Sequence, residues 1–288
     1  MTKVSIEGNK WLVDGIPTYP NIKYQGNSIE GLLLNARMVN SIFDDENPYT
    51  RDIWNYPDTG EWDADRNTDE FVSMLPEYRG QGLAAITVNL QGGAPSGYYR
   101  LNQFRQFMRE KGMSVSDSEI WKGLPSPESQ PWDSSGFTPD GSLKIEYTHR
   151  LSRILEKTNQ LSMVVVLGLF YFGQDERLQD EEAIKSAVRN ACEWILSSGY
   201  ENVVIEINNE CSVPKYEHEI LQPHRVHELI KLAQSVTVNY RRLLVGTSYG
   251  GNTIPGNNVA KASDFILMHG NSVTEPIRIS EMVKETRE

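Results

Sequence analysis

Six short apolar runs alternate with amphipathic stretches along most of this chain. The runs are rich in Val, Ile and Leu, and they span residues 31–39, 83–90, 162–170, 202–208, 242–248 and 264–270. Nearly continuous apolar runs of this length are typical of parallel strands that are buried on both faces. Six strands that each alternate with a helix predict a parallel α/β fold, either a doubly wound sheet or a (β/α) barrel.

The segments around these runs complete the expected organisation. We expect helices within residues 68–81, 143–160, 180–199, 223–236 and 275–288. Residues 1–20 turn at two Gly-containing sites, which predicts a small antiparallel hairpin ahead of the main fold. No Gly-x-Gly-x-x-Gly follows the first run, so a dinucleotide-binding sheet lacks its main signature. We therefore treat residues 1–288 as one barrel-type domain.

Composition and charge exclude several classes of protein. The 288 residues carry a net charge of −11 without a basic stripe, which argues against a nucleic-acid partner. No apolar window reaches about 18 residues, so no membrane span is expected. The start of the chain does not read as a signal peptide, and Cys192 and Cys211 do not form a disulfide framework. These features predict a cytoplasmic, reducing location.

Two segments are too long to be simple connections between a strand and a helix. Residues 41–67 and 91–141 each follow a strand, at its carboxyl end. Long loops inside a compact domain are usually functional, and in a barrel this end carries the active site.

Aromatic and amide side chains in these loops and at other strand ends suit a carbohydrate cleft, because sugars offer apolar faces to rings and hydroxyls to amides. The candidates for substrate binding are Asn89, Trp54, Trp132, Tyr171, Gln174 and Tyr249. The alternative is that some of these rings anchor the long loops.

The stretch "NVVIEINNEC", residues 202–211, places polar groups in and after the fourth run. Side chains alternate along a strand, so Glu206 and Asn208 share one face, and the strand then delivers Asn209 and Glu210 at its carboxyl end. A carboxylate there can act as a general acid if its pKa is raised, and the preceding amide can hold a substrate hydroxyl. This pairing suits hydrolysis of a glycosidic bond.

With "VVIEINNE" on its fourth strand, the chain resembles the clan A glycoside hydrolases, (β/α)8 barrels related to cellulases and mannanases. The resemblance implies that Glu210 is the acid/base residue and that Asn209 binds the sugar 2-hydroxyl. It also implies that Arg37 and His269 shape the surroundings of the nucleophile, and it implies no cofactor. Cys211 stands where the clan has proline. Arg37 has a second interpretation, which is that it pairs with the interior Glu206.

One part of the expected site is missing from the sequence. A retaining glycosidase needs a second carboxylate about 5–5.5 Å from the acid/base. The clan places it after a seventh strand, whereas here one helix follows the sixth, with Glu275, Glu281 and Glu285 in or beside it. Three explanations remain open for this incomplete barrel. The chain is a partial form of a longer enzyme, or a second copy or partner covers the open edge, or an early segment closes the barrel.

Other chemistries have weaker support in the sequence. The acidic run at residues 43–47 could hold Ca²⁺ or Mg²⁺, but it lacks the spaced ligands of an EF-hand and suits loop capping. His218, His224 and His227 could suggest a metal hydrolase, without a carboxylate at the usual spacing. The expected function is retaining hydrolysis of a β-linked glucan or mannan-type oligosaccharide. The alternative is a non-catalytic carbohydrate-binding barrel that has lost its nucleophile.

Overall fold

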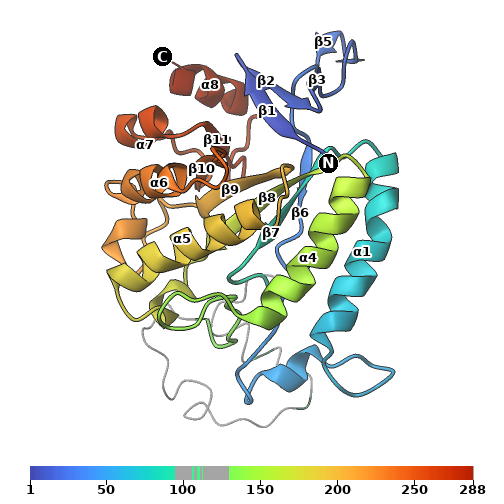
Figure 1. The fold of residues 1–288 in the computed structure, drawn as a ribbon, viewed down its shortest axis with the longest axis vertical. Coiled ribbons are helices and arrows are strands. Elements are labelled where there is room, and N and C mark those ends of the chain that lie inside the picture. Colours follow the sequence, from blue (N-terminus) through green and yellow to red (C-terminus); the bar gives the residue numbers. More distant parts are fainter. Residues whose placement is uncertain (95–105, 107–108, 111, 113–129, 288) are drawn as a thin grey trace.

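Six parallel strands form the centre of the molecule, and they pair strictly in chain order. The computed structural model describes residues 1–94, 106, 109–110, 112 and 130–287, so most of the second long loop lies outside the described residues. The strands are β6 (Asn35–Arg37), β7 (Ala85–Asn89), β8 (Val164–Phe170), β9 (Val203–Asn208), β10 (Leu244–Tyr249) and β11 (Phe265–Met268). They form a curled half-barrel with helices between the strands (Figure 1), which confirms the predicted fold class.

Helices follow the strands and cover the outer face of the sheet (Figure 1). They are α1 (Ala64–Gly80), α4 (Ile145–Gln160), α5 (Glu181–Ser197), α6 (Val226–Ser235), α7 (Asn257–Ala262) and α8 (Pro276–Arg287). Asp63 and Asp180 cap α1 and α5, since each carboxylate accepts the backbone N–H three residues later. The cap at Asp63 starts α1 four residues earlier than the sequence predicts. No helix of the described residues is long and apolar enough to cross a membrane.

The N-terminal segment forms more strands than the predicted hairpin. β1 (Val4–Glu7), β2 (Lys10–Val13) and β3 (Ile16–Pro17) make a three-stranded antiparallel sheet, and β4 (Lys23–Tyr24) pairs with β5 (Asn27–Ser28). The sequence predicts the turn between β2 and β3 but not their pairing. Only two residues of β3 take part in this pairing, which is too short to leave a pattern in the sequence.

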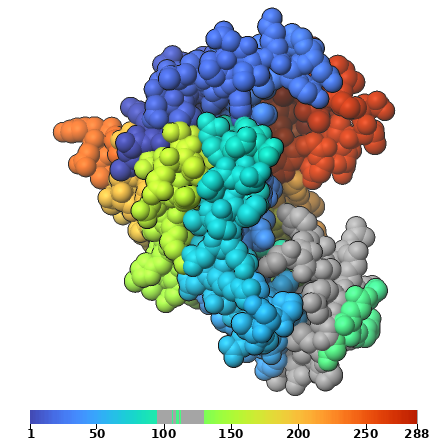
Figure 2. Space-filling model, turned by 90° about the vertical axis from the view of Figure 1, so that its right-hand side faces the viewer, coloured from blue at the N-terminus to red at the C-terminus, as the bar shows by residue number. Residues whose placement is uncertain are grey.

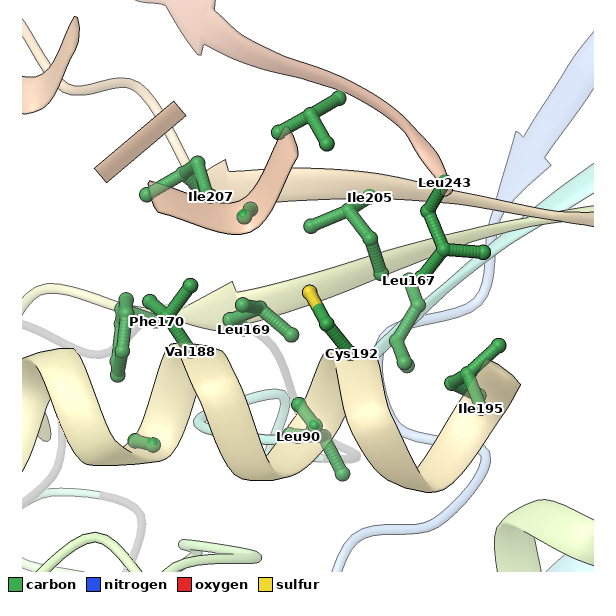
Figure 3. Close-up of a cluster of buried hydrophobic side chains, with 14 of the residues drawn as sticks. Leu90, Leu167, Leu169, Phe170, Val188, Cys192, Ile195, Ile205, Ile207 and Leu243 are labelled. Atoms are coloured by element: carbon green, nitrogen blue, oxygen red, sulfur yellow. The ribbon is translucent and has the colours of Figure 1, made fainter. Parts of the chain in front are cut away.

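The main core lies between the outer face of the sheet and the helices. Figure 3 shows Leu167 and Leu169 of β8 and Ile205 of β9 facing Cys192 and Ile195 of α5. The period of two along these strands aims every second apolar side chain at the helices. Cys192 is a fully buried free thiol, as its position on the apolar face of α5 predicts.

The inner face of the half-barrel carries a second, smaller apolar cluster. Val164, Val166 and Val204 line it, and Trp11 of β2 packs on it, with its ring 5.3 Å from that of Phe265. The N-terminal sheet therefore covers one end of the inner face.

The two outer strands, β6 and β11, leave this face partly open. All four residues of β11 are half-buried, although an inner strand of a parallel sheet is normally buried. A cavity of about 210 Å³ lies between the two strands, lined by Trp11, Leu33, Asn35, Val166, Phe265, Ile266, Leu267 and Met268. Figure 2 shows the surface hollowed between the blue N-terminal segment and the red C-terminal segment.

The packing predicts which apolar side chains carry the stability. Ile205 is fully buried between the sheet and α5, whereas Ile16 is 61% exposed. We expect Ile205→Ala to lower the free energy of unfolding by about 2–5 kcal/mol, because it leaves a cavity. Ile16→Ala should change it by less than about 0.5 kcal/mol. Urea unfolding of both variants measures the difference, and equal losses would contradict the assignment of this core.

Candidate active site

The register of the parallel sheet brings the polar ends of its strands together. Gly168 of β8 lies opposite both Asn89 of β7 and Glu206 of β9. Beyond this row, the chain after β9 continues into Asn209 and Glu210, at the edge where the long loops leave the sheet. The fold thus positions the predicted pair at the carboxyl end of the fourth parallel strand.

The backbone of Glu210 adopts an unusual conformation that the surrounding chain holds in place. Its φ is 50°, in the left-handed region that non-glycine residues rarely occupy. Its N–H donates to Ser248 Oγ at 2.7 Å, and the Cys211 N–H donates to the Ser248 carbonyl at 2.9 Å. The end of β10 therefore fixes the turn, and such strain often marks a functional position.

Two side chains from beyond β11 bind the carboxylate of Glu210. His269 Nδ1 lies 2.7 Å from Oε1, and Asn271 Nδ2 donates to the same oxygen at 2.8 Å. The His269 contact is the main cause that holds the pKa of Glu210 below its ordinary value, against the opposing effect of burial. Asn271 and the charges of His269 and Arg37 lower this pKa further. Glu210 is thus ionised at neutral pH, whereas the sequence argument asked for a raised pKa.

Arg37 of β6 joins the interior of the half-barrel to the candidate site. Its guanidinium donates to Asn209 Oδ1 at 2.5 Å and lies 3.6 Å from Glu206 Oε2. The pairing of Arg37 with Glu206 is therefore confirmed, whereas its place beside the nucleophile stays a prediction. Glu206 is fully buried, and Arg37 supplies the opposite charge that a buried carboxylate requires. The Asn209 carbonyl also accepts the hydroxyl of Tyr216 at 2.5 Å.

The side chains expected to bind substrate are buried, and their contact with a substrate stays a prediction. Each is at most 7% exposed: Asn89, Trp54, Trp132, Tyr171, Gln174 and Tyr249. Trp54 and Trp132 contact each other edge-on, with ring centroids 6.0 Å apart, and so join the two long loops. Gln174 accepts from the Ser134 N–H and donates to the Trp132 carbonyl. Trp54, Trp132 and Gln174 thus hold loops together, which agrees with the alternative that some of these rings anchor the long loops.

Asp45 explains why the acidic run at residues 43–47 is a loop anchor. Its Oδ2 accepts from Thr50 Oγ1 at 2.6 Å and Trp54 Nε1 at 2.7 Å, while its Oδ1 accepts the N–H groups of Asn47 and Asp133. Burial raises the pKa of Asp45 to about 6, against these four bonds.

The histidines give the metal-hydrolase interpretation no support. His224 contacts Glu219 at 3.0 Å, and His227 contacts Asn258 at 3.1 Å. His218 contacts the carbonyl of Leu178 at 3.0 Å. Within the described ranges, no group of three or more His, Cys, Asp or Glu side chains could hold a metal ion.

The buried carboxyl group of Asp175 holds the segment that follows Glu210. Asp175, after β8, accepts the N–H groups of Glu217 and His218 at 3.0 and 3.3 Å. Burial, followed by the charge of Glu176, raises the pKa of Asp175 well above its usual range. Tyr216 of the same segment donates to the Asn209 carbonyl, so this segment links Asp175 to the candidate site.

This raised pKa predicts a pH-dependent stability. Folding favours protonated Asp175, so its contribution is complete below about pH 4 and is lost as the pH rises through the folded-state pKa. Asp175→Asn keeps an acceptor for the two N–H groups and removes the charge. We expect the variant to gain stability over the wild type as the pH rises from 5 to 9, in urea unfolding. Asp52→Asn, at an exposed site, should show no such gain. A constant difference for Asp175→Asn across this range would refute the assignment.

Comparisons with known proteins place the fold among glycoside hydrolase structures. A provisionally assigned glycoside hydrolase from Bacteroides vulgatus matches with a TM-score of 0.56 at 12% identity, over 100% of this chain and 46% of that one. A glycoside hydrolase family 5 structure from the same organism gives a TM-score of 0.47 at 12% identity, with coverages of 99% and 50%. A β-1,4-D-mannanase from Cryptopygus antarcticus gives 0.47 at 12% identity, with coverages of 93% and 72%.

The similarity to known proteins lies in the fold and does not extend to the sequence. No family model matches the chain, and no curated protein sequence matches it. The chain spans about half the length of the first two of these structures. At 12% identity the match to the first establishes the fold alone, which is a partial (β/α) barrel.

Proposed function

We propose that this chain carries the acid/base half of a retaining glycoside-hydrolase site that acts on β-linked glucan or mannan-type oligosaccharides. The observation that carries this proposal is the setting of Glu210. It follows the fourth parallel strand, its side chain is 13% exposed, and His269 contacts its carboxylate. The fold likeness to a glycoside hydrolase structure supports the same conclusion.

The neighbours of Glu210 have defined tasks in this proposal. Arg37 engages Asn209 Oδ1, so the NH₂ group is the end of this amide that donates to the sugar 2-hydroxyl. Glu210 protonates the departing glycosidic oxygen and later takes a proton from the attacking water. The first of these steps needs a protonated carboxyl group. A second carboxylate about 5–5.5 Å away, the nucleophile of such a site, raises the pKa of its neighbour by like-charge repulsion.

A specific observation favours the alternative, a carbohydrate-binding barrel without turnover. The charged groups that act on the pKa of Glu210 are His269 and Arg37, both of which lower it. No carboxylate is among the main groups of the described residues that shift it. A site in this state holds an ionised Glu210, which can accept hydrogen bonds from sugar hydroxyls but has no proton to donate.

Substitution of Glu210 tests the catalytic proposal. In a form with turnover, we expect Glu210→Gln to lower kcat on β-linked oligosaccharides by about 10²–10⁴-fold, because the proton donor is lost. Aryl β-glycosides with good leaving groups need little protonation in the first step, so their kcat/KM should fall much less. Reducing-sugar release and aryl release measure the two effects. Glu219→Gln, at an exposed carboxylate after the site, is the matched control.

The same assays separate the two functions. Calorimetric binding of oligosaccharides without any product, in a form that supplies a second carboxylate at this site, would support the binding barrel. Turnover that Glu210→Gln leaves unchanged on both substrate types would remove Glu210 from the mechanism.

A further inference from the structure

Asn271 is a side chain of the site that the sequence argument did not single out. It lies two residues beyond His269, on the segment between β11 and α8. Its amide donates to Glu210 Oε1, the same oxygen that His269 contacts. Among the described residues, no hydrogen bond reaches Glu210 Oε2. The two oxygens of this carboxylate therefore have different surroundings: two groups hold Oε1, and no hydrogen bond from the described residues holds Oε2.

A glycine after β10 makes this arrangement possible. A Cβ on Gly251 would lie 1.6 Å from the carbonyl oxygen of Asn271 and 2.9 Å from its Oδ1, so only glycine allows this approach. A Cβ on Gly250 would lie 4.0 Å from Cδ of Glu210, so the carboxyl group rests close to the backbone there. The turn after β10 thus sets the distance between Asn271 and Glu210.

We propose that Asn271 is a positioning residue that fixes Oε1 of Glu210 and leaves Oε2 as the oxygen that exchanges the catalytic proton. The proposal rests on the proposed function for the reaction in which this proton moves. In the acid step, the proton on Oε2 passes to the departing oxygen, which keeps the electron pair of the broken C–O bond. In the base step, Oε2 takes a proton from water, whose oxygen bonds to the sugar carbon and displaces the second carboxylate.

Asn271 also acts on the charge state of Glu210. The charged groups that face this carboxylate are His269, beyond β11, and Arg37, on β6. Asn271 adds a neutral donor, and a donor stabilises the ionised carboxylate more than the neutral acid. Its removal should therefore raise the pKa of Glu210 while His269 and Arg37 stay in place. A residue that served only the packing of the segment would leave this pKa unchanged.

Titration of Glu210 tests the proposal without any need for turnover. Protein labelled with ¹³C at the glutamate carboxyl groups gives a signal for Glu210, assigned from its loss in Glu210→Gln. We expect Asn271→Ala to move the titration midpoint upward, and Asn271→Asp to move it further by like-charge repulsion. Asn257→Ala, at an exposed site in α7, should leave it at the wild-type value. A midpoint for Asn271→Ala equal to that of the wild type would overturn the proposal.

A second variant tests the geometry with Asn271 itself intact. Gly251→Ala adds one methyl group where the Asn271 carbonyl lies, so it should displace the segment and shift the Glu210 midpoint in the same direction as Asn271→Ala. Thermal unfolding identifies any variant that has lost its fold, in which case Asn271→Asp decides. In a form with turnover, Asn271→Ala should lower kcat/KM about tenfold and move the alkaline limb of its pH profile to higher pH.

The outcomes for Asn271 and for the proposed function are distinguishable. A shifted midpoint in Asn271→Ala, together with catalysis that survives Glu210→Gln, would keep Asn271 as the partner of Glu210 and reject the acid/base role. An unchanged midpoint, together with catalysis lost in Glu210→Gln, would keep the acid/base role and reject Asn271 as its positioning residue.

Discussion

The in-register pairing of six parallel strands is the constraint on which the rest of the structure depends. One row of the sheet runs from Asn89 through Gly168 and Glu206 to Gly246. Because successive strands point the same way, the carboxyl ends of all of them open at one edge, and Glu210 emerges there. Two of the four positions in this row are glycine. A Cβ at Gly168 would lie 2.5 Å from Asn89 Oδ1, so the missing side chain is what lets the amide lie across the sheet.

This row also places a charged side chain, Glu206, in the interior of the sheet. Glu206 is buried beside two glycines, and isolated burial of its carboxylate would be very costly without an opposite charge. Arg37 meets this need at 3.6 Å and is long enough to reach Asn209 as well. A single side chain therefore neutralises the interior and orients an amide of the site. Removing Arg37 would affect both, so a loss of function in an Arg37 variant alone does not identify a contact with substrate.

The sequence predicts the frame of this structure better than the details of its site. Strands appear because their apolar runs are short and continuous, and Asn209 and Glu210 are placed by counting those strands. The burial of Trp54 and Trp132 was not predictable, because a ring in a long loop can face either the solvent or another loop. Asn271 was missed for a related reason. An exposed amide after a strand has no pattern of its own, and its close approach to Gly251 and its bond to Glu210 are visible only in the folded structure.

The charge state of Glu210 connects the fold to the chemistry. His269 and Asn271 both stabilise the ionised carboxylate, and Arg37 adds to their effect. Such surroundings favour the ionised form of Glu210, which can accept a proton or a hydrogen bond from a sugar hydroxyl, over the protonated form that donates. In a retaining mechanism the residue must do both in turn, and the change between the two roles requires a second negative charge close to Oε2. The same donors that keep Glu210 ionised then become useful. They hold Oε1 still while the neighbouring charge decides whether Oε2 carries the proton.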